Sequence, residues 1–591
     1  MPNIRVEPLG ISVEAPKGAV LRDVLYDARI LLDYPCGGRG RCHQCRVSVA
    51  DASGASQHAD RPALACQLVI QGDCTVTIPP DRFSARIWKH GVLDQDIRSE
   101  GADERPSIKR VRVGLSAPTL EDQRPDWERL ADALKARGTL VGAPDPHELE
   151  RLSIVLREGN WTVDAVCDEE RLLRLDAGGR RVTGFAIDLG TTTVDIALVD
   201  LETRTLIGRK AFLNKQVAFG ADVISRALSF HDDRGPVREA GLTTIEDGAW
   251  ELLEEAGENA EGVLRTVVVG NPIMMHILHG IDPWQLTRLP YIPVTARRLQ
   301  RNPHELGWSF QGHGLVETLP LISAYVGADT VGMIVALGLD REKSTSLSID
   351  IGTNGEIVLS RQGSLLATST AAGPAFEGAQ ISCGMRALPG AIVAVDIHLD
   401  GVIELQTVED AQPQGICGTG LVSAVAQLLE RGVVDATGRL LDPTDIVIPG
   451  LRDRIFSLGG EPAFALTQDG RVSITQKDIR TLQLAKGAVR AGIDTLLATT
   501  GIQPDGLDAL RLAGNFGAGL DARAAMRIGL VPPMEIDKVQ VVGNAALRGA
   551  VMSLLSHEYI KRSDNIAKRA RFIELGGKSE FQAMLMEAML F

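Results

Sequence analysis

The pattern of apolar and polar residues predicts a small domain at the start of the chain. Residues 18–32 place Leu21, Val24, Leu25 and Ala28 on one side of a helix. Strands are predicted where apolar and polar side chains alternate, at residues 4–9, 11–14, 45–49 and 74–78. We therefore expect residues 1–82 to form a domain of strand, strand, helix, loop and two further strands.

Residues 83–180 are more charged and less regular. Strand patterns occur at residues 111–115 and 161–166, and helix patterns at residues 126–137 and 144–156. No motif for chemistry stands out in this part. We interpret it as a linker domain.

The rest of the chain is dominated by apolar strands that end in glycine turns, and one such unit occurs twice. Residues 184–198 read Gly-Phe-Ala-Ile-Asp-Leu-Gly-Thr-Thr-Thr-Val-Asp-Ile-Ala-Leu, and residues 347–359 read Leu-Ser-Ile-Asp-Ile-Gly-Thr-Asn-Gly-Glu-Ile-Val-Leu. A repeat spaced by about 160 residues predicts two similar lobes that face each other. We expect an α/β fold with a first lobe at residues 181–344 and a second at residues 345–591.

Composition limits the classes of function. The 591 residues suffice for several domains, and 44% of them are hydrophobic, so large cores can form. A net charge of −14 argues against a nucleic-acid partner. There is no basic-plus-apolar leader and no apolar run of about 18 residues, so we expect a cytoplasmic protein without a membrane partner.

Four cysteines in the first domain indicate a metal cluster. Cys36, Cys42 and Cys45 follow C-x5-C-x2-C spacing, and Cys66 comes later in Leu-Ala-Cys-Gln. This arrangement is close to that of plant-type [2Fe–2S] ferredoxins. Glycines at positions 37, 38 and 40 would let the backbone approach the cluster sulfurs. The alternative is a structural zinc site, but zinc favours paired C-x2-C motifs and only one is present.

Cys74 is a rival for the fourth cluster ligand. It alternates with Val76 and Ile78, which predicts an apolar strand face and a buried thiol. Cys66 is therefore the preferred ligand, and Cys74 stays as the alternative.

The two repeated turns carry residues suited to a nucleotide. Turn backbone together with Thr or Asn side chains donates hydrogen bonds to phosphate oxygens. Asp188 and Asp350, at the strand ends, can hold Mg²⁺ through water, since Mg²⁺ usually keeps several waters and takes one or two carboxylates. A single turn of this kind could be an ordinary hairpin; two matched copies favour the nucleotide site.

Further strand–turn–helix connectors occur in both predicted lobes, at residues 267–276, 510–518 and 541–549. Residues 415–429 form a glycine-rich turn that leads into a helix, which suits a nucleotide but also fits a simple helix start. Met274, Met275 and His276 follow one connector, and we interpret them as helix core rather than a metal site.

Taken together, these motifs resemble the actin-like ATPase superfamily, and with the N-terminal ferredoxin they resemble the reductive activators of corrinoid proteins, the RACo and RamA-like family. The resemblance covers essentially the whole chain. Matching stretches include the cysteine motif, Leu-Ala-Cys-Gln at 64–67, Gly-Pro-Ala-Phe-Glu-Gly at 373–378 and residues 478–488. RamA-like proteins carry [4Fe–4S] motifs near the C-terminus, whereas this sequence has no cysteine after Cys417, so it resembles the [2Fe–2S] branch.

The resemblance implies a β-grasp ferredoxin, a linker domain and a two-lobed actin-like ATPase that together reduce Co(II) of a corrinoid methyl-carrier protein to Co(I). That reduction is uphill from a [2Fe–2S] centre at roughly −400 mV, so ATP would supply the energy. It also implies an upstream electron donor, and whether the chain forms a homodimer stays open.

The resemblance further implies roles for individual residues. Cys36, Cys42, Cys45 and Cys66 would hold the cluster; Asp188 and Asp350 would position Mg²⁺; Glu377 is a candidate to orient the attacking water. Phosphate contacts are expected from Thr191, Thr192, Gly352, Thr353 and Asn354. Adenosine contacts are expected from Gly418, Thr419 and Gly420. The alternatives are an activase or a redox sensor for another low-potential metalloenzyme.

Overall fold

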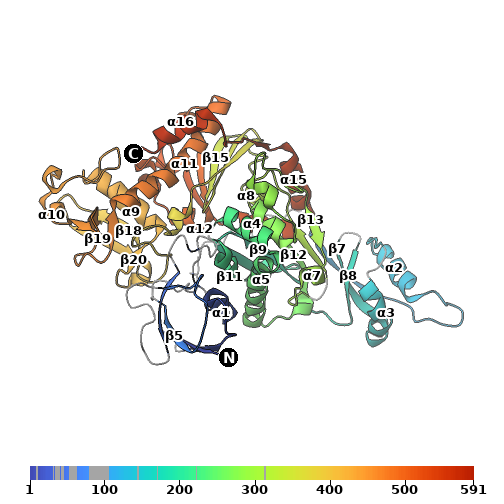
Figure 1. Cartoon of the computed structure of the whole chain (residues 1–591). Coiled ribbons are helices and arrows are strands. Elements are labelled where there is room, and N and C mark those ends of the chain that lie inside the picture. Colours follow the sequence, from blue (N-terminus) through green and yellow to red (C-terminus); the bar gives the residue numbers. More distant parts are fainter. Residues whose placement is uncertain are drawn as a thin grey trace.

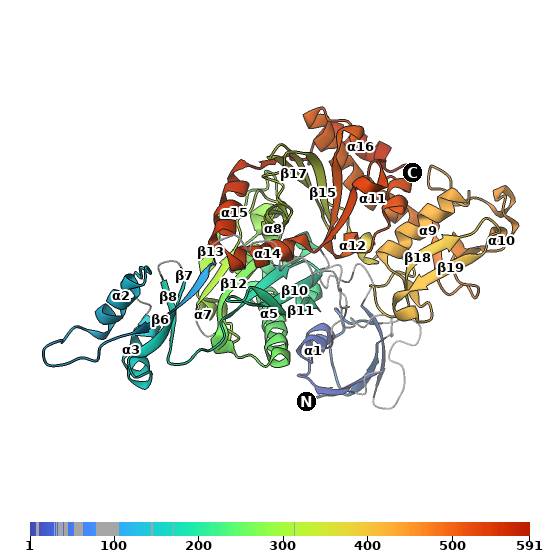
Figure 2. The same ribbon diagram turned by 180° about the vertical axis from the view of Figure 1, so that it is seen from behind.

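The computed structural model describes residues 1–7, 11–28, 30, 32, 40, 45–51, 63–78, 106–142, 146–168, 171–220, 222–311 and 314–591. Figure 1 shows a small N-terminal domain below two larger lobes, with a further unit that projects from the first lobe. Figure 2 shows the same arrangement from behind.

The N-terminal domain is a five-stranded sheet in the order β2-β1-β5-β3-β4, with β1 and β5 parallel and the other pairs antiparallel. Helix α1 buries Leu21, Val24 and Leu25 against the sheet. The predicted helix over residues 18–32 is shorter than expected, because the N–H of Ile30 donates to the carbonyl of Leu25 and closes the chain into a turn. The elements are β1 (Asn3–Glu7), β2 (Ile11–Glu14), α1 (Leu21–Asp27), β3 (Arg46–Asp51), β4 (Ala63–Leu64) and β5 (Cys74–Thr77). This is the predicted β-grasp.

The linker is a three-stranded antiparallel sheet, β6-β7-β8, covered by two helices. Its separate apolar core includes Leu130, Leu134 and Leu156. Strand β8 was not predicted. The elements are β6 (Ile108–Gly114), α2 (Asp126–Ala136), α3 (Pro146–Glu158), β7 (Thr162–Asp168) and β8 (Arg171–Asp176).

The first lobe is built on a six-stranded sheet in the order β11-β10-β9-β12-β14-β13. Strands β9 and β12 pair in parallel and are almost wholly buried, which is why their sequences are mainly apolar, interrupted by Asp188 in β9 and by Arg265 and Thr266 in β12. The strands are β9 (Thr183–Leu189), β10 (Thr193–Asp200), β11 (Thr205–Leu213), β12 (Val263–Gly270), β13 (Leu299–Arg301) and β14 (Leu315–Thr318). The helices are α4 (Val223–Asp232), α5 (Arg234–Ala256), α6 (Pro272–Leu278), α7 (Pro303–Leu306) and α8 (Ala328–Leu337).

The second lobe repeats this plan with the sheet order β25-β24-β15-β16-β17-β26. In both lobes an antiparallel hairpin continues into parallel strands, which confirms the predicted fold of two similar lobes. The strands of this sheet are β15 (Thr345–Ile351), β16 (Gly355–Arg361), β17 (Ser364–Thr370), β24 (Ala509–Ala513), β25 (Val539–Gly543) and β26 (Arg571–Phe572).

The second lobe also carries two three-stranded sheets, β19-β18-β20 and β21-β22-β23. Their strands are β18 (Ala391–Ile397), β19 (Ile403–Thr407), β20 (Gly415–Ile416), β21 (Ile455–Leu458), β22 (Glu461–Ala465) and β23 (Ser473–Thr475). The helices of this lobe are α9 (Gly418–Glu430), α10 (Pro449–Arg452), α11 (Gln476–Thr500), α12 (Gly514–Ala518), α13 (Ala522–Arg527) and α16 (Ser579–Ala588).

Two late helices join the lobes. Helices α14 (Ala545–Leu555) and α15 (His557–Arg569) follow β25 in the chain, but their apolar residues belong to the core of the first lobe. Figure 2 shows α14 beside β12 and β10. The packing therefore crosses the division at residue 344 that the sequence suggests.

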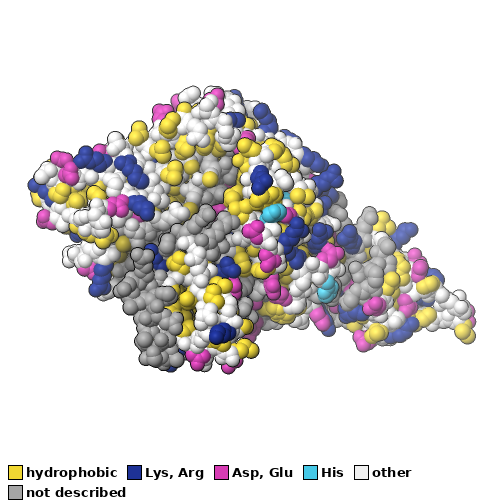
Figure 3. Space-filling view, in the orientation of Figure 1, with side chains coloured by type: hydrophobic (Ala, Val, Ile, Leu, Met, Phe, Trp, Pro, Cys, Tyr) yellow, Lys and Arg dark blue, Asp and Glu magenta, His cyan; other side chains and the backbone are white. Residues whose placement is uncertain are grey.

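On the face shown in Figure 3, acidic and basic side chains are interspersed, and Lys and Arg are denser along the edge that carries α15 and β13. Across the described residues, no helix combines the length and the apolar character needed to span a bilayer.

Candidate functional site

The two repeated turns meet at a single side chain, Glu377. It ends a short helical turn (Pro374–Glu377) that follows β17 in the second lobe. The Thr192 hydroxyl of the first hairpin donates to one carboxylate oxygen of Glu377 at 2.6 Å, and the Thr353 hydroxyl of the second donates to the other. The structure thus brings the predicted residues Thr192, Thr353 and Glu377 together between the lobes.

Two asparagine amides complete the first hairpin. Asn271, at the N-cap of α6, donates to the Thr191 hydroxyl at 3.1 Å. Asn544, at the N-cap of α14, donates to Asp188 at 2.9 Å and to Asp195 at 3.1 Å. Both asparagines lie in connectors that the sequence predicts, at residues 267–276 and 541–549, but no role was predicted for them; a Gly-Asn pair after each strand was the available signal.

Each hairpin carries a pair of carboxylates at facing positions. Asp188 on β9 faces Asp195 on β10, and Asp350 on β15 faces Glu356 on β16. No role was predicted for Asp195 or Glu356 from the sequence. Like charges at facing positions destabilise a sheet unless something compensates them.

Crowding and burial make these carboxylates hard to ionise. Burial raises the pKa of Asp188 well above its usual range, and the carboxylates of Asp329, Asp195 and Asp350 raise it further. Burial, together with the Asp329 carboxylate, raises the pKa of Asp350 to about 7. Burial also raises the pKa of Glu356, with contributions from Asp329 and Asp350. Asp329, in the first turn of α8, is therefore a further member of the group.

The described residues contain no group of three His, Cys, Asp or Glu side chains that could hold a metal ion on its own. A hydrated Mg²⁺ does not need one, because it takes one or two carboxylates and keeps several waters. The hard oxygen donors of Asp350 and Glu356, whose ionised forms a cation would stabilise, fit that ion.

Gly514 shapes the surroundings of Asp350. A Cβ at position 514 would lie 2.3 Å from Oδ1 of Asp350, and the backbone has φ +81°. Only glycine lets the start of α12 approach the carboxylate this closely.

The glycine turn at the start of α9 lies beside Glu377. A Cβ on Gly418 would lie 1.8 Å from the carbonyl oxygen of Phe376, so the two backbones are in contact. Gly420 is packed equally tightly against the carbonyl of Ile392, while Thr419 is partly exposed. The predicted residues Gly418, Thr419 and Gly420 thus adjoin the Glu377 turn. Close backbone packing by itself explains why glycine occupies positions 418 and 420. Gly352 and Asn354 are partly exposed in the second turn, where the Gly352 N–H donates to the carbonyl of Asn354 at 2.9 Å.

In the N-terminal domain, two of the predicted cluster ligands are adjacent. The sulfurs of Cys45 and Cys66 are 3.3 Å apart, and both residues are buried. Cys74 lies opposite Asp51, at the other end of β3 from Cys45. The six residues from Cys45 to Asp51 span about 20 Å along the strand, so Cys74 is far from the Cys45–Cys66 pair. Burial and the Asp73 carboxylate raise the pKa of the Cys74 thiol, which makes it a poor ligand. Cys36 and Cys42 lie outside the described residues.

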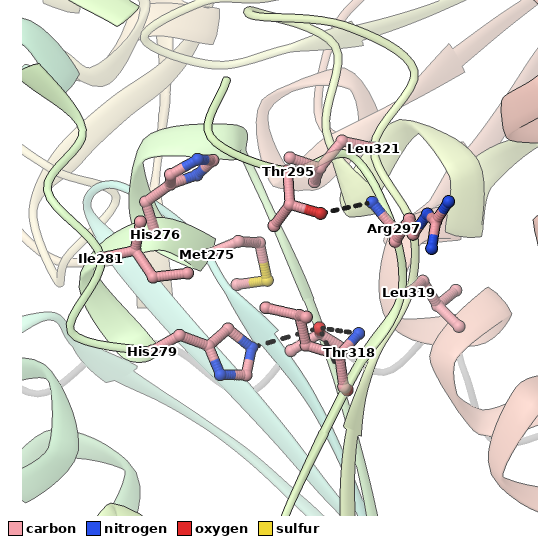
Figure 4. Close-up of a pocket in the computed structure, with 10 residues that line it drawn as sticks. Met275, His276, His279, Ile281, Thr295, Arg297, Thr318, Leu319 and Leu321 are labelled. Atoms are coloured by element: carbon pink, nitrogen blue, oxygen red, sulfur yellow. Dashed lines mark hydrogen bonds between the residues drawn. The ribbon is translucent and has the colours of Figure 1, made fainter. Parts of the chain in front are cut away.

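Met275 and His276 of α6 line a small separate pocket (Figure 4). Both ring nitrogens of His276 are engaged by backbone, at Pro272 O (2.6 Å) and at the Val294 N–H (3.1 Å). Burial lowers the pKa of His279 to about 4, so its ring is neutral. Met274, Met275 and His276 are buried, as expected for helix core.

Comparisons with known proteins agree along the whole chain. A family model described as the C-terminal domain of RACo, the ASKHA domain, matches residues 344–591. Models described as the RACo middle region and the RACo linker region match residues 183–342 and 99–181. A 2Fe-2S iron-sulfur cluster binding domain matches residues 4–71.

Individual relatives match most or all of the chain. The chain is 28% identical over 595 residues to the corrinoid activation enzyme RamQ of Eubacterium limosum, covering 98% of this chain and 97% of that protein. It is 28% identical to a [Co(II) methylated amine-specific corrinoid protein] reductase of Methanosarcina barkeri, covering 65% of this chain and 72% of the other. A solved structure titled reductive activator for corrinoid, iron-sulfur protein superposes with a TM-score of 0.75 and 32% identity, covering 100% of this chain and 98% of that chain.

Proposed function

Because this chain belongs to the family of reductive activators of corrinoid proteins, we propose that it uses ATP to reduce the inactive Co(II) of a corrinoid protein to Co(I), with one electron from a [2Fe–2S] cluster of its own. The observation that carries the proposal is the joining of a 2Fe-2S domain to two hairpins that converge on one carboxylate, Glu377. The partner is a corrinoid methyl-carrier protein, and an upstream donor returns the electron to the cluster.

At the nucleotide site, the hydroxyls of Thr192 and Thr353 point at a common centre. Phosphate oxygens would take these donors, together with Thr191 and the turn around Gly352 and Asn354. Asp350 and Asp188 would hold hydrated Mg²⁺, which neutralises phosphate charge when bound. Glu377, freed from the two threonines, would accept a hydrogen bond from the attacking water. Gly418, Thr419 and Gly420, next to Glu377, would contact the adenosine.

In the N-terminal domain, we propose Cys36, Cys42, Cys45 and Cys66 as cluster ligands. The adjacent sulfurs of Cys45 and Cys66 fit two ligands of one small cluster, whereas Cys74 is too distant. The cluster supplies a low-potential one-electron donor. The protein buries Cys45 and Cys66 in the apolar core of the domain, which limits solvent access to that side.

The test is an anaerobic mixing experiment. The reduced protein is combined with a Co(II) corrinoid protein, with and without Mg-ATP, and Co(I) absorbance is followed. We expect Co(I) to form only with ATP; formation at the same rate without it, or none at all, would refute the proposal.

The ligand assignment has a matched control in the chain. We expect Cys66→Ser to lose the [2Fe–2S] spectrum and Cys74→Ser to keep it. An unchanged spectrum in Cys66→Ser would show that the fourth ligand lies elsewhere.

A further inference from the structure

One short segment of the first lobe, residues 214–220, touches both the nucleotide hairpin and the cluster domain. We call it the coupling segment. It comprises Asn214, the 3-10 turn Lys215–Phe219 and Gly220, and it connects β11 with the region before α4.

The first end of the coupling segment is hydrogen-bonded to the hairpin. The backbone N–H of Asn214 donates to the carbonyl of Thr192 at 2.9 Å, and its side-chain amide donates to the carbonyl of Gly190 at 2.9 Å. Its side-chain oxygen accepts from the N–H of Gln216 and caps the turn. Asn214 is fully buried, so a shift of the Gly190–Thr192 turn reaches the coupling segment directly.

The other end of the coupling segment is packed into the cluster domain. Ala218 is buried as a member of the apolar core that also contains Cys45 and Cys66. Phe219 packs against that core and against the core of the first lobe. Figures 1 and 2 both show the N-terminal domain beside the lobe near β11.

Hydrogen bonds to neighbouring helices fix the rest of the coupling segment in place. The Lys215 N–H donates to the Thr244 hydroxyl, and the Gln216 amide donates to the carbonyl of Val237, both at 3.0 Å. The Ser229 hydroxyl donates to the carbonyl of Phe219 at 2.8 Å. A turn held at this many points moves as a unit instead of absorbing a displacement.

A second route leads from Glu377 to the same segment. The buried guanidinium of Arg226 donates through Nε to the carbonyl of Gly220 at 2.8 Å, while its Nη2 has no hydrogen-bond partner among the residues that the structure describes. Burial lowers the pKa of Arg226 to about 9, and the Glu377 carboxylate acts in the opposite direction. Glu377 is therefore a counter-charge of the cation that holds the end of the coupling segment.

We propose that the coupling segment transmits nucleotide binding to the cluster domain, so that ATP at the hairpins loosens the contact of Ala218 and Phe219 with the ferredoxin core and releases the domain toward its partner. A phosphate that takes the Thr192 hydroxyl must displace Glu377 from it. The Gly190–Thr192 turn and the Arg226 side chain then shift. The coupling segment, which is bonded to both, moves relative to the apolar core of the cluster domain, against which Ala218 and Phe219 are packed. This inference rests on the proposed ATP site.

The test is hydrogen–deuterium exchange of the full chain with its cluster in place, with and without a non-hydrolysable Mg-ATP analogue. We expect residues 1–7, 11–28 and 63–78 to exchange faster by about threefold or more when the analogue is bound, as for a domain whose docking has weakened. No change in these residues in a protein that binds the analogue would overturn the inference.

Two partly buried phenylalanines provide a matched comparison. Phe219 contacts both cores, whereas Phe212 packs against the first-lobe core alone among the described cores. We expect Phe219→Ala to bind the analogue but lose the exchange response, and Phe212→Ala to keep the response. Equal loss in both variants would mean that general packing, not the segment, carries the effect, and would overturn the inference.

Asn214→Ser provides a second variant at the other end of the coupling segment. Serine keeps the cap but does not reach Gly190. We expect the response to be lost here too, and a full response would contradict the route through Asn214. ATP-dependent Co(I) formation is measured in parallel: Co(I) without an exchange response refutes the coupling alone, and a response without Co(I) refutes the proposed function alone.

Discussion

The two hairpins have the same strand pairing and the same paired carboxylates, yet they neutralise them differently. In the first, Arg209 donates to Asp195 through Nε at 2.8 Å and forms a bidentate ion pair with it. Asn544 donates to both Asp188 and Asp195. In the second, Glu356 accepts a hydrogen bond from Ser369 at 3.3 Å, and no Lys or Arg among the described residues forms an ion pair with Asp350 or Glu356.

The difference indicates that the two hairpins have different roles in the nucleotide site. The first hairpin is compensated by the protein itself, so its geometry is fixed before any ligand arrives. The second leaves its carboxylates without a protein cation. Burial raises the pKa of the strand-end aspartate in both hairpins, so the missing cation, and not the pKa shift, is what separates the second hairpin from the first. We therefore expect Mg²⁺ to bind nearer to Asp350 than to Asp188.

The strongest test replaces each strand-end aspartate. We expect Asp350→Asn to lower ATP hydrolysis by about 100-fold or more, because it removes a carboxylate that would hold the metal. Asp188→Asn should lose only about tenfold, since asparagine keeps an oxygen for Asn544 and Arg209 still neutralises Asp195. The measurement is steady-state ATP hydrolysis against Mg²⁺ concentration.

Both aspartate variants need a check of folding, by thermal melting and by the cluster spectrum. A larger loss in Asp188→Asn than in Asp350→Asn would reverse the proposed division between the hairpins.

A second test crowds the Asp350 side without changing a charge. The Cβ of Gly514→Ala would lie 2.3 Å from the Asp350 carboxylate, so we expect ATP hydrolysis to fall by about tenfold or more. Gly501→Ala is the control: its φ is also positive, at +67°, but the space around it is open. If both variants lowered ATP hydrolysis equally, the loss would come from backbone strain at a positive φ and not from crowding of the Asp350 carboxylate.

The residues that the sequence predicted are those that local motifs define. Asp188 and Thr192 lie within one strand–turn unit, and Asp350 and Thr353 lie within the other, so the proximity of each pair follows from its own hairpin. Glu377 needed the family resemblance, because nothing in the residues around it shows that it reaches the opposite lobe. The two-lobed fold was predictable because the hairpin pattern occurs twice.

The residues that were missed depend on register or on distant packing. Asp195 and Glu356 face the aspartates only once the strand pairing is known. Asn544 reaches Asp188 across 356 positions because α14 returns to the first lobe. No periodicity in the sequence encodes that return.

A third test removes the compensation in the first hairpin. Asn544→Ser keeps the N-cap of α14 but leaves Asp188 and Asp195 without the amide, so we expect the free energy of unfolding to fall by about 1–3 kcal/mol. Denaturant unfolding measures it. Asn302→Ser, at the exposed N-cap of α7, is the control, with an expected change of a few tenths of a kcal/mol. A similar change in both variants would show that Asn544 acts as a cap alone.

The smallest expected effect is a pH dependence that separates the hairpins. The pKa of Asp350 is raised to about 7, so the folded chain binds more protons here than the unfolded chain between about pH 4 and 7. This carboxyl therefore makes the free energy of unfolding fall as pH rises through that window and level off above it. Mg²⁺ favours the ionised form, so its stabilising effect should be small near pH 5.5, grow through pH 7 and level near pH 8.

Thermal melting with and without Mg²⁺ measures this difference, with an expected rise of about 2–4 °C at pH 8. Asp350→Asn should remove the pH dependence of the Mg²⁺ effect, and Asp188→Asn should retain most of it. The reverse pattern would place the ion at the first hairpin, where Arg209 would have to tolerate a second cation beside Asp195. That arrangement would place two cations, Mg²⁺ and the Arg209 guanidinium, beside the same carboxylate, Asp195. Because the two cations repel each other, the second hairpin is the electrostatically favoured site for Mg²⁺.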